Sequence, residues 1–116
     1  MKILILEDET IVQILVEEFV EMLGHEVVGP ASTLDQGMRL AQECDAAILD
    51  VNLGDDQKSY PLAELLMEMD KPFIFVTGYA PSSVDDFPTV HKLTKPIRLS
   101  QLREAVDAHL IQKADG

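Results

Sequence analysis

Three apolar stretches, each followed by charged residues, decide the fold of this chain: Ile3-Leu4-Ile5-Leu6 before Glu7-Asp8, Ala46-Ala47-Ile48-Leu49 before Asp50, and Val90 to Thr94 before Lys95-Pro96. Short apolar runs of this kind are typical of strands that are buried on both faces of a parallel sheet. The carboxyl ends of parallel strands meet at one edge of the sheet, where open α/β folds place their binding sites. We therefore expect the charged residues to lie together at that edge.

A cluster of carboxylates at one edge requires a compensating positive charge. Two like charges ~4 Å apart repel each other by about 4 kcal/mol at an effective dielectric constant near 20. Glu7, Asp8 and Asp50 offer oxygen ligands, which hard divalent cations prefer. The sequence therefore predicts a divalent-cation site, with Lys95 as a cationic neighbour.

The composition indicates one domain with its own core. The chain has 116 residues, 47% of them hydrophobic, which is enough to bury a core without disulfides. The net charge of −12 argues against partners such as nucleic acid or anionic membrane surfaces. No stretch reaches the length of a membrane span, and the single cysteine, Cys44, fits a reducing compartment. We expect a single domain over residues 1–116, located in the cytoplasm.

Strands and helices alternate along the sequence. Apolar runs predict five strands, at residues 2–6, 26–28, 45–49, 73–76 and 90–94. Helical patterns extend from Thr10 to about Leu23, over about 33–43, over about 60–69, and from near Ser100 to about Gln112. This alternation predicts an α/β fold with a parallel sheet covered by helices on both faces, in the flavodoxin-like strand order 2-1-3-4-5.

Capping and turn residues set the expected boundaries of these elements. Gly24 is placed to end the first helix, and Gly29-Pro30 to end the second strand. Ser32 or Thr33 is suited to cap the second helix, and Ser100 the last one. The interval between the fourth and fifth strands is short and holds two prolines, so we expect only about one helical turn there, around residues 82–86.

The polar residues at the strand ends resemble those of the receiver domains of two-component response regulators, over essentially the whole chain. The matching set is Glu7, Asp8, Asp50, Thr77 and Lys95-Pro96. The resemblance implies that Asp50 accepts a phosphoryl group from a phosphohistidine on a histidine kinase or a histidine phosphotransfer protein, and that phosphorylation switches partner binding. Such a domain is a signalling module of a phosphorelay and not a metabolic enzyme.

The resemblance also implies roles for the residues around Asp50. A Mg²⁺ ion would be held by Glu7, Asp8, Asp50 and the backbone carbonyl of Asn52. Lys95 would contact the phosphoryl oxygens, and Thr77 would be the switch residue that donates a hydrogen bond to one of them. Gly78 would leave room for the phosphoryl group.

Two departures from the usual receiver pattern concern aromatic residues. Most receivers have an aromatic switch residue three positions before the lysine, where this chain has Lys92. The run from Phe75 to Tyr79 resembles the Phe-Ala-Thr-Gly-hydrophobic-Tyr branch of receivers, which often occur as stand-alone domains, but here the tyrosine follows Gly78 directly. We expect Tyr79 to act as a substitute aromatic that shields the phosphoryl group from water.

The first helix is more apolar than one buried face requires. Its expected core face consists of Val12, Val16, Phe19, Val20 and Leu23. A second apolar arc consists of Ile11, Ile14, Leu15 and Met22. With Ile97, this arc is expected to form a docking patch for the kinase or the phosphotransfer protein. The alternative is that the helix is covered more deeply than usual.

Two other functions are compatible with a small α/β domain. The first is a receiver-like binding module that is not phosphorylated, although the complete acidic set and Lys95 argue against it. The second is a small flavodoxin-like or metal-dependent phosphatase-like domain. Flavin and nucleotide binders need a phosphate-cradling loop after the first strand, where this chain has the anionic run Glu7-Asp8-Glu9. Asn52 cannot titrate as the general acid of a phosphatase. The sequence leaves the oligomeric state open, and also whether the chain is part of a longer protein.

Overall fold

The computed structural model describes residues 1–54, 57–78 and 87–112. Its strands are β1 (Lys2–Leu6), β2 (Glu26–Ala31), β3 (Ala46–Asp50), β4 (Phe73–Thr77) and β5 (Lys92–Thr94). Its helices are α1 (Thr10–Met22), α2 (Leu34–Leu40), η1 (Ala41–Glu43), α3 (Tyr60–Glu68), α4 (Leu99–Ala105) and η3 (Val106–Ile111). No helix of this described part is long and apolar enough to cross a membrane.

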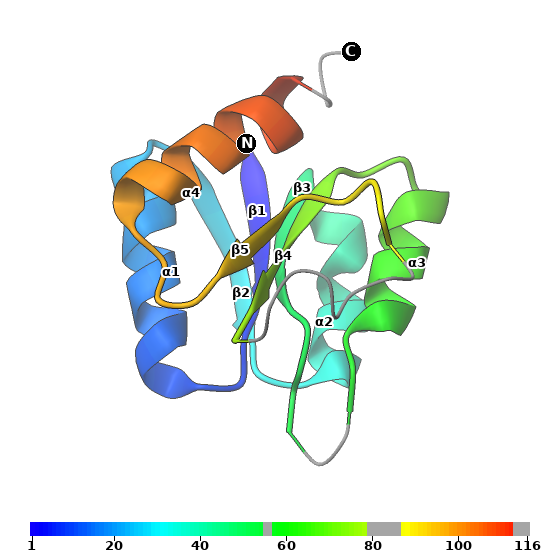
Figure 1. Cartoon of the computed structure of the whole chain (residues 1–116). Coiled ribbons are helices and arrows are strands. Elements are labelled where there is room, and N and C mark those ends of the chain that lie inside the picture. The colour runs from blue at the N-terminus through cyan, green and yellow to red at the C-terminus, as the bar shows by residue number, and fades with distance from the viewer. Residues whose placement is uncertain (55–56, 79–86, 113–116) are drawn as a thin grey trace.

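The five strands form one parallel sheet in the order β2-β1-β3-β4-β5, which confirms the predicted flavodoxin-like fold. Figure 1 shows α1 and α4 on one face of the sheet and α2 and α3 on the other. Alternate strand residues point to opposite faces. Leu4 and Leu6 therefore join the core under α2 and α3, whereas Ile3 and Ile5 join the core under α1 and α4. Both faces need apolar residues, which explains the continuous apolar runs.

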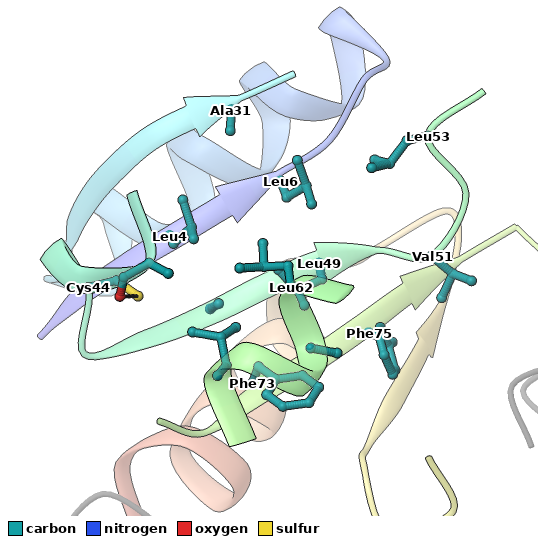
Figure 2. Close-up of a cluster of buried hydrophobic side chains, with 14 of the residues drawn as sticks. Leu4, Leu6, Ala31, Cys44, Leu49, Val51, Leu53, Leu62, Phe73 and Phe75 are labelled. Atoms are coloured by element: carbon teal, nitrogen blue, oxygen red, sulfur yellow. Dashed lines mark hydrogen bonds between the residues drawn. The ribbon is translucent and has the colours of Figure 1, made fainter. Parts of the chain in front are cut away.

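The core between the sheet and α3 is rich in leucine and aromatic side chains (Figure 2). Figure 2 shows Leu62 of α3 beside Leu49 of β3, and Leu6 of β1 belongs to the same cluster. The Phe75 ring is fully buried and makes an edge contact with the Phe87 ring at a centroid distance of 5.3 Å. These contacts fix the central strands β3 and β4, which carry polar residues at their carboxyl ends.

The predicted core face of α1 is confirmed, because Val16 and Val20 are buried and their neighbours on the same arc are partly buried. The second apolar arc faces solvent, with exposed fractions of 84% for Ile11, 51% for Ile14, 37% for Leu15 and 66% for Met22. The expectation for Ile97 was wrong. Its side chain is 6% exposed and packs in the core with α1 and α4, so it does not extend this surface.

Strand β2 is longer than predicted. It continues through Gly29-Pro30 to Ala31, because its pairing with β1 shifts register between Leu4 and Leu6. Gly29 adopts a φ of +92°, and a Cβ atom there would lie 2.7 Å from the backbone nitrogen of Ala31. A glycine is therefore required at the irregularity, which bends the strand without ending it.

Two other boundaries differ slightly from the expectation, and one cap is confirmed. Strand β5 begins at Lys92, not at Val90, because Val90 closes a turn by donating its N–H to the Phe87 carbonyl. Arg98, not Ser100, precedes the first residue of α4, and its N–H donates to Gln101 Oε1. Thr33 caps α2 through a 3.2 Å hydrogen bond from the Gln36 N–H, as predicted. The helical turn expected around residues 82–86 lies outside the described residues.

Candidate functional site

The three predicted carboxylates lie together at the carboxyl edge of the sheet. Glu7 directly follows β1, and Asp50 is the last residue of the neighbouring strand β3. One carboxylate oxygen from each of Glu7, Asp8 and Asp50 lies within 4.8 Å of the others. Glu7 and Asp50 are 3% and 4% exposed, whereas Asp8 is exposed to solvent. The expected convergence is therefore confirmed, with two of the carboxylates buried.

Lys95 provides the positive charge at this edge. Its Nζ lies 3.2 Å from both carboxylate oxygens of Glu7 and 3.5 Å from Asp50 Oδ2. It also lies 3.2 Å from the Oε1 atom of Glu9, which was not among the predicted site residues. The only sequence signal for Glu9 was its position in the acidic run after β1, because its contact with Lys95 depends on where β5 ends.

The pKa values of Asp50 and Lys95 show that the carboxylates outweigh the available positive charge. Burial and then the neighbouring Glu7 carboxylate raise the pKa of Asp50 to about 8, although Lys95 opposes this change. Partial burial on its own lowers the pKa of Lys95, but the charges of Asp50 and Glu7 outweigh it and raise the pKa overall. Lys95 is therefore an ammonium at neutral pH, and Asp50 retains a proton until more positive charge arrives.

The donor atoms at this site fit a hard divalent cation. The converging ligand atoms are all carboxylate oxygens, and the raised pKa of Asp50 indicates unmatched negative charge. Mg²⁺ is typically bound by one or two carboxylates, together with waters and phosphate oxygens. The exposed Asp8 leaves one side open to solvent, as such a site requires.

Thr77 and Gly78 lie beside Asp50. Thr77 ends β4, which pairs with β3, and its side chain is fully buried. Its carbonyl accepts a 2.8 Å hydrogen bond from the Lys95 N–H, which ties the ends of β4 and β5 together. Gly78 borders the site, and a Cβ atom built on it would meet no atom of the described residues within 4 Å. Within that part of the chain, the space beside Gly78 is open.

An open cleft of about 310 Å³ lies over these residues. It is lined by Glu9, Asp50, Asn52, Gly78 and Lys95. The Asn52 side-chain oxygen accepts a hydrogen bond from the Lys58 ammonium, and the two residues form an isolated antiparallel bridge. The cleft is lined by residues at, or just after, the carboxyl ends of four adjacent strands, β1, β3, β4 and β5.

The two predicted departures in aromatic residues have different outcomes. Lys92 occupies β5, and its ammonium donates 2.6 Å hydrogen bonds to the carbonyls of Phe87 and Val90. Lys92 therefore anchors the segment before β5, and this position has no aromatic side chain to act as a switch. Tyr79, the proposed substitute, lies outside the described residues.

The chain resembles known signalling proteins in both sequence and structure, although no protein family model matches it. It is 34% identical over 82 residues to the phyllosphere-induced regulator PhyR of Methylorubrum extorquens, covering 67% of this chain and 31% of that protein. The solution structure of BeF3-activated SdrG from Pseudomonas melonis Fr1 is 38% identical, with a TM-score of 0.80, over 92% of this chain and 93% of SdrG. The response regulator PhyR from Brucella abortus is 28% identical, with a TM-score of 0.86, over 98% of this chain and 49% of that protein.

Together with these similarities, the flavodoxin-like fold and the acidic cluster at its carboxyl edge define a signalling domain and not a metabolic enzyme. The chain belongs to the receiver domains of two-component response regulators. It spans about a third of the M. extorquens PhyR and about half of the B. abortus PhyR.

Proposed function

We propose that Asp50 accepts a phosphoryl group from a phosphohistidine in a Mg²⁺-dependent reaction, and that phosphorylation switches partner binding. The observation that carries this proposal is the convergence of Glu7, Asp8, Asp50 and Lys95 on one cleft at the carboxyl edge of the sheet. The solved BeF3-activated state of SdrG supports it, because that related receiver has an activated conformation with a phosphoryl mimic.

The proposed step transfers one phosphoryl group without net oxidation or reduction. An oxygen of the ionised Asp50 carboxylate forms a bond to phosphorus, and the bond from phosphorus to the donor imidazole nitrogen breaks. The electron pair of that bond returns to the imidazole, and the product on this chain is an acyl phosphate. Such transfers depend mainly on positioning and on charge stabilisation, so a carboxylate is a sufficient nucleophile.

The residues around Asp50 would position and stabilise the phosphoryl group. Lys95 would contact its oxygens in place of some of its present carboxylate partners, and the Thr77 hydroxyl would donate to another. Glu7, Asp8, Asp50 and the Asn52 carbonyl would hold Mg²⁺, which would supply positive charge that offsets the negative charge of the transferred group. Because added positive charge lowers the pKa of Asp50, metal binding would also favour the ionised nucleophile.

The switch would begin at Thr77. A hydrogen bond from its hydroxyl to a phosphoryl oxygen would draw the end of β4 toward Asp50 and bias the conformation of the segment that follows. The usual coupling of the threonine to an aromatic side chain cannot operate, because the aromatic position holds Lys92, whose ammonium donates hydrogen bonds to the carbonyls of Phe87 and Val90. Tyr79 is the proposed substitute, on the basis of the sequence.

The phosphodonor would dock on the exposed apolar arc of α1. Its four residues are Ile11, Ile14, Leu15 and Met22. The helix begins at Thr10, directly after the acidic run, so a helix of a kinase or phosphotransfer protein on this arc would lie near the cleft. An exposed apolar patch of this kind favours binding to an amphipathic helix.

Binding of beryllofluoride, a phosphoryl mimic, tests the proposed function. We expect amide NMR shifts around Asp50 and Thr77 when beryllofluoride and Mg²⁺ are added together, and none with beryllofluoride in EDTA. Asp50→Asn should abolish the shifts. Asp45→Asn is the matched control, because Asp45 precedes the other end of the same strand and its carboxylate accepts the Lys2 N–H there. Equal binding by the parent and Asp50→Asn would refute the assignment.

A further inference from the structure

Glu9 places a fourth carboxylate at the mouth of the cleft. Its Oε1 lies 3.2 Å from Lys95 Nζ, as close as the oxygens of the buried Glu7. The Glu9 side chain is 62% exposed, whereas those of Glu7 and Asp50 are each 4% exposed. Glu9 therefore covers the solvent side of Lys95, and the two buried carboxylates cover the inner side.

The backbone of Glu9 is fixed while its side chain reaches into solvent. Its N–H donates to Glu7 Oε1 at 3.1 Å, and its carbonyl accepts the Gln13 N–H at 2.9 Å. Glu9 is also the residue that precedes the first turn of α1. These contacts hold the side chain at the cleft without making it part of the cluster of converging carboxylates formed by Glu7, Asp8 and Asp50.

We infer that Glu9 determines donor specificity by restricting the access of small anionic phosphodonors to Lys95. This inference rests on the proposed function of Asp50. An incoming phosphoryl oxygen needs the same ammonium that Glu9 occupies, and the Glu9 charge also repels the anion as it approaches. A free donor such as acetyl phosphate has little other binding energy with which to displace Glu9.

A protein donor is affected less by Glu9. Docking on α1 would hold its phosphohistidine at a high effective concentration beside the cleft, so transfer depends less on electrostatic attraction of the phosphoryl group. Glu9 would thus lower nonspecific phosphorylation by small metabolite phosphodonors while preserving transfer from the docked partner. Because the ion pair is exposed to solvent, we expect an effect of about two- to fivefold.

The test compares Glu9→Gln with Glu68→Gln. Both variants lose one negative charge from an exposed glutamate, but Glu68 lies at the end of α3, on the other face of the sheet from α1. We expect Glu9→Gln to raise the phosphorylation rate with acetyl phosphate, and the affinity for beryllofluoride in Mg²⁺, by about two- to fivefold over Glu68→Gln. Transfer from a phosphohistidine protein donor should change by a smaller factor.

A metal-free measurement tests the ion pair itself. In EDTA, Glu9→Gln removes the repulsion between Glu9 and the neighbouring carboxylates in both the parent and a Lys95→Met background. In the parent it also removes the attraction between Glu9 and Lys95. The urea midpoint should therefore rise by more in the Lys95→Met background than in the parent. Equal shifts in both backgrounds would show that the pair does not form and would overturn the inference.

The possible outcomes separate the inference from the function on which it rests. If the parent binds no beryllofluoride with Mg²⁺, the proposed function fails and the inference fails with it. If the parent binds it but Glu9→Gln behaves like Glu68→Gln, only the inference is overturned. An equal acceleration with both donors would also overturn it. A loss of Mg²⁺ affinity in Glu9→Gln alone would make Glu9 a metal ligand instead.

Discussion

The ammonium of Lys95 lies 3.2 Å from the carboxylate of Glu7, although the two residues are 88 positions apart in the chain. They follow β5 and β1, which are separated in the sheet by β3 and β4. The lysine side chain therefore extends across the ends of two strands to reach Glu7. This contact links the first and last strands through charge, at the point where the proposed phosphoryl acceptor lies.

Replacing Lys95 should destabilise the metal-free protein. Lys95→Met removes the ammonium that lies beside the buried side chains of Glu7 and Asp50, and it leaves the buried carboxylate of Glu7 without its cationic partner, which is costly. We expect the free energy of unfolding in EDTA to fall by about 1–3 kcal/mol. Arg39→Met, at an exposed position of α2, is the control for loss of one cation and should change it little. Equal losses in both variants would contradict the role of Lys95.

Asp50 should make the stability of the metal-free protein depend on pH. Its pKa is about 8 in the folded state and near 3.8 when unfolded, so the folded state holds an extra proton between these values. Stability from this group is therefore present below about pH 4 and is lost as the pH rises to about 8. An asparagine side chain does not titrate, so the Asp50→Asn variant keeps its stability as the pH rises. At pH 9 in EDTA its free energy of unfolding should exceed that of the parent by about 1–3 kcal/mol.

Urea unfolding of both proteins at pH 5 and pH 9 measures the difference. The gap between Asp50→Asn and the parent should widen from pH 5 to pH 9 in EDTA. Added Mg²⁺ should stabilise the parent at pH 9 and have a smaller effect on the variant. A gap that does not depend on pH would show that Asp50 is not the group that retains the proton.

A charge on the exposed arc of α1 should impair transfer from the protein donor. Ile14 is 51% exposed, so Ile14→Lys should leave the fold intact. If the donor docks there, the transfer rate should fall at least about fivefold, while beryllofluoride binding stays unchanged. Met67→Lys is the matched control, since Met67 is 52% exposed on α3, on the other face of the sheet. Unchanged transfer in Ile14→Lys would place the docking site elsewhere.

Lys92 should contribute to stability through two hydrogen bonds. Its ammonium donates to the carbonyls of Phe87 and Val90 at 2.6 Å each. Lys92→Met removes both charge-assisted bonds, and we expect the free energy of unfolding to fall by about 2 kcal/mol. Lys2→Met, at an exposed position of β1, should change it by less than about 0.5 kcal/mol. Similar values for the two variants would mean that the anchoring bonds contribute nothing.

Local signals in the sequence were sufficient for the sheet and for most of the site. The apolar runs located the central strands, since a strand buried on both faces needs apolar residues at consecutive positions. The parallel order then brought Glu7, Asp50 and Lys95 to one edge, whatever the exact ends of the helices. Thr33 was also found as a helix cap, because a side-chain cap acts within a few residues.

Contacts between distant segments were not predictable in the same way. The continuation of β2 through Gly29-Pro30 depends on its shifted register with β1, which the local sequence does not contain. Ile97 is buried because α1 and α4 pack around it, although its position after Lys95-Pro96 suggested exposure. Glu9 contacts Lys95 only because β5 ends opposite the start of α1.

Phosphorylation of the intact chain tests the central assignment most directly. The protein is incubated with acetyl phosphate and Mg²⁺, its mass is measured, and the modified residue is located after borohydride reduction of the acyl phosphate. We predict the gain of one phosphoryl group at Asp50, which is lost in EDTA and in Asp50→Asn but retained in Asp45→Asn. No gain of mass in the parent, or an equal gain in Asp50→Asn, would contradict the account.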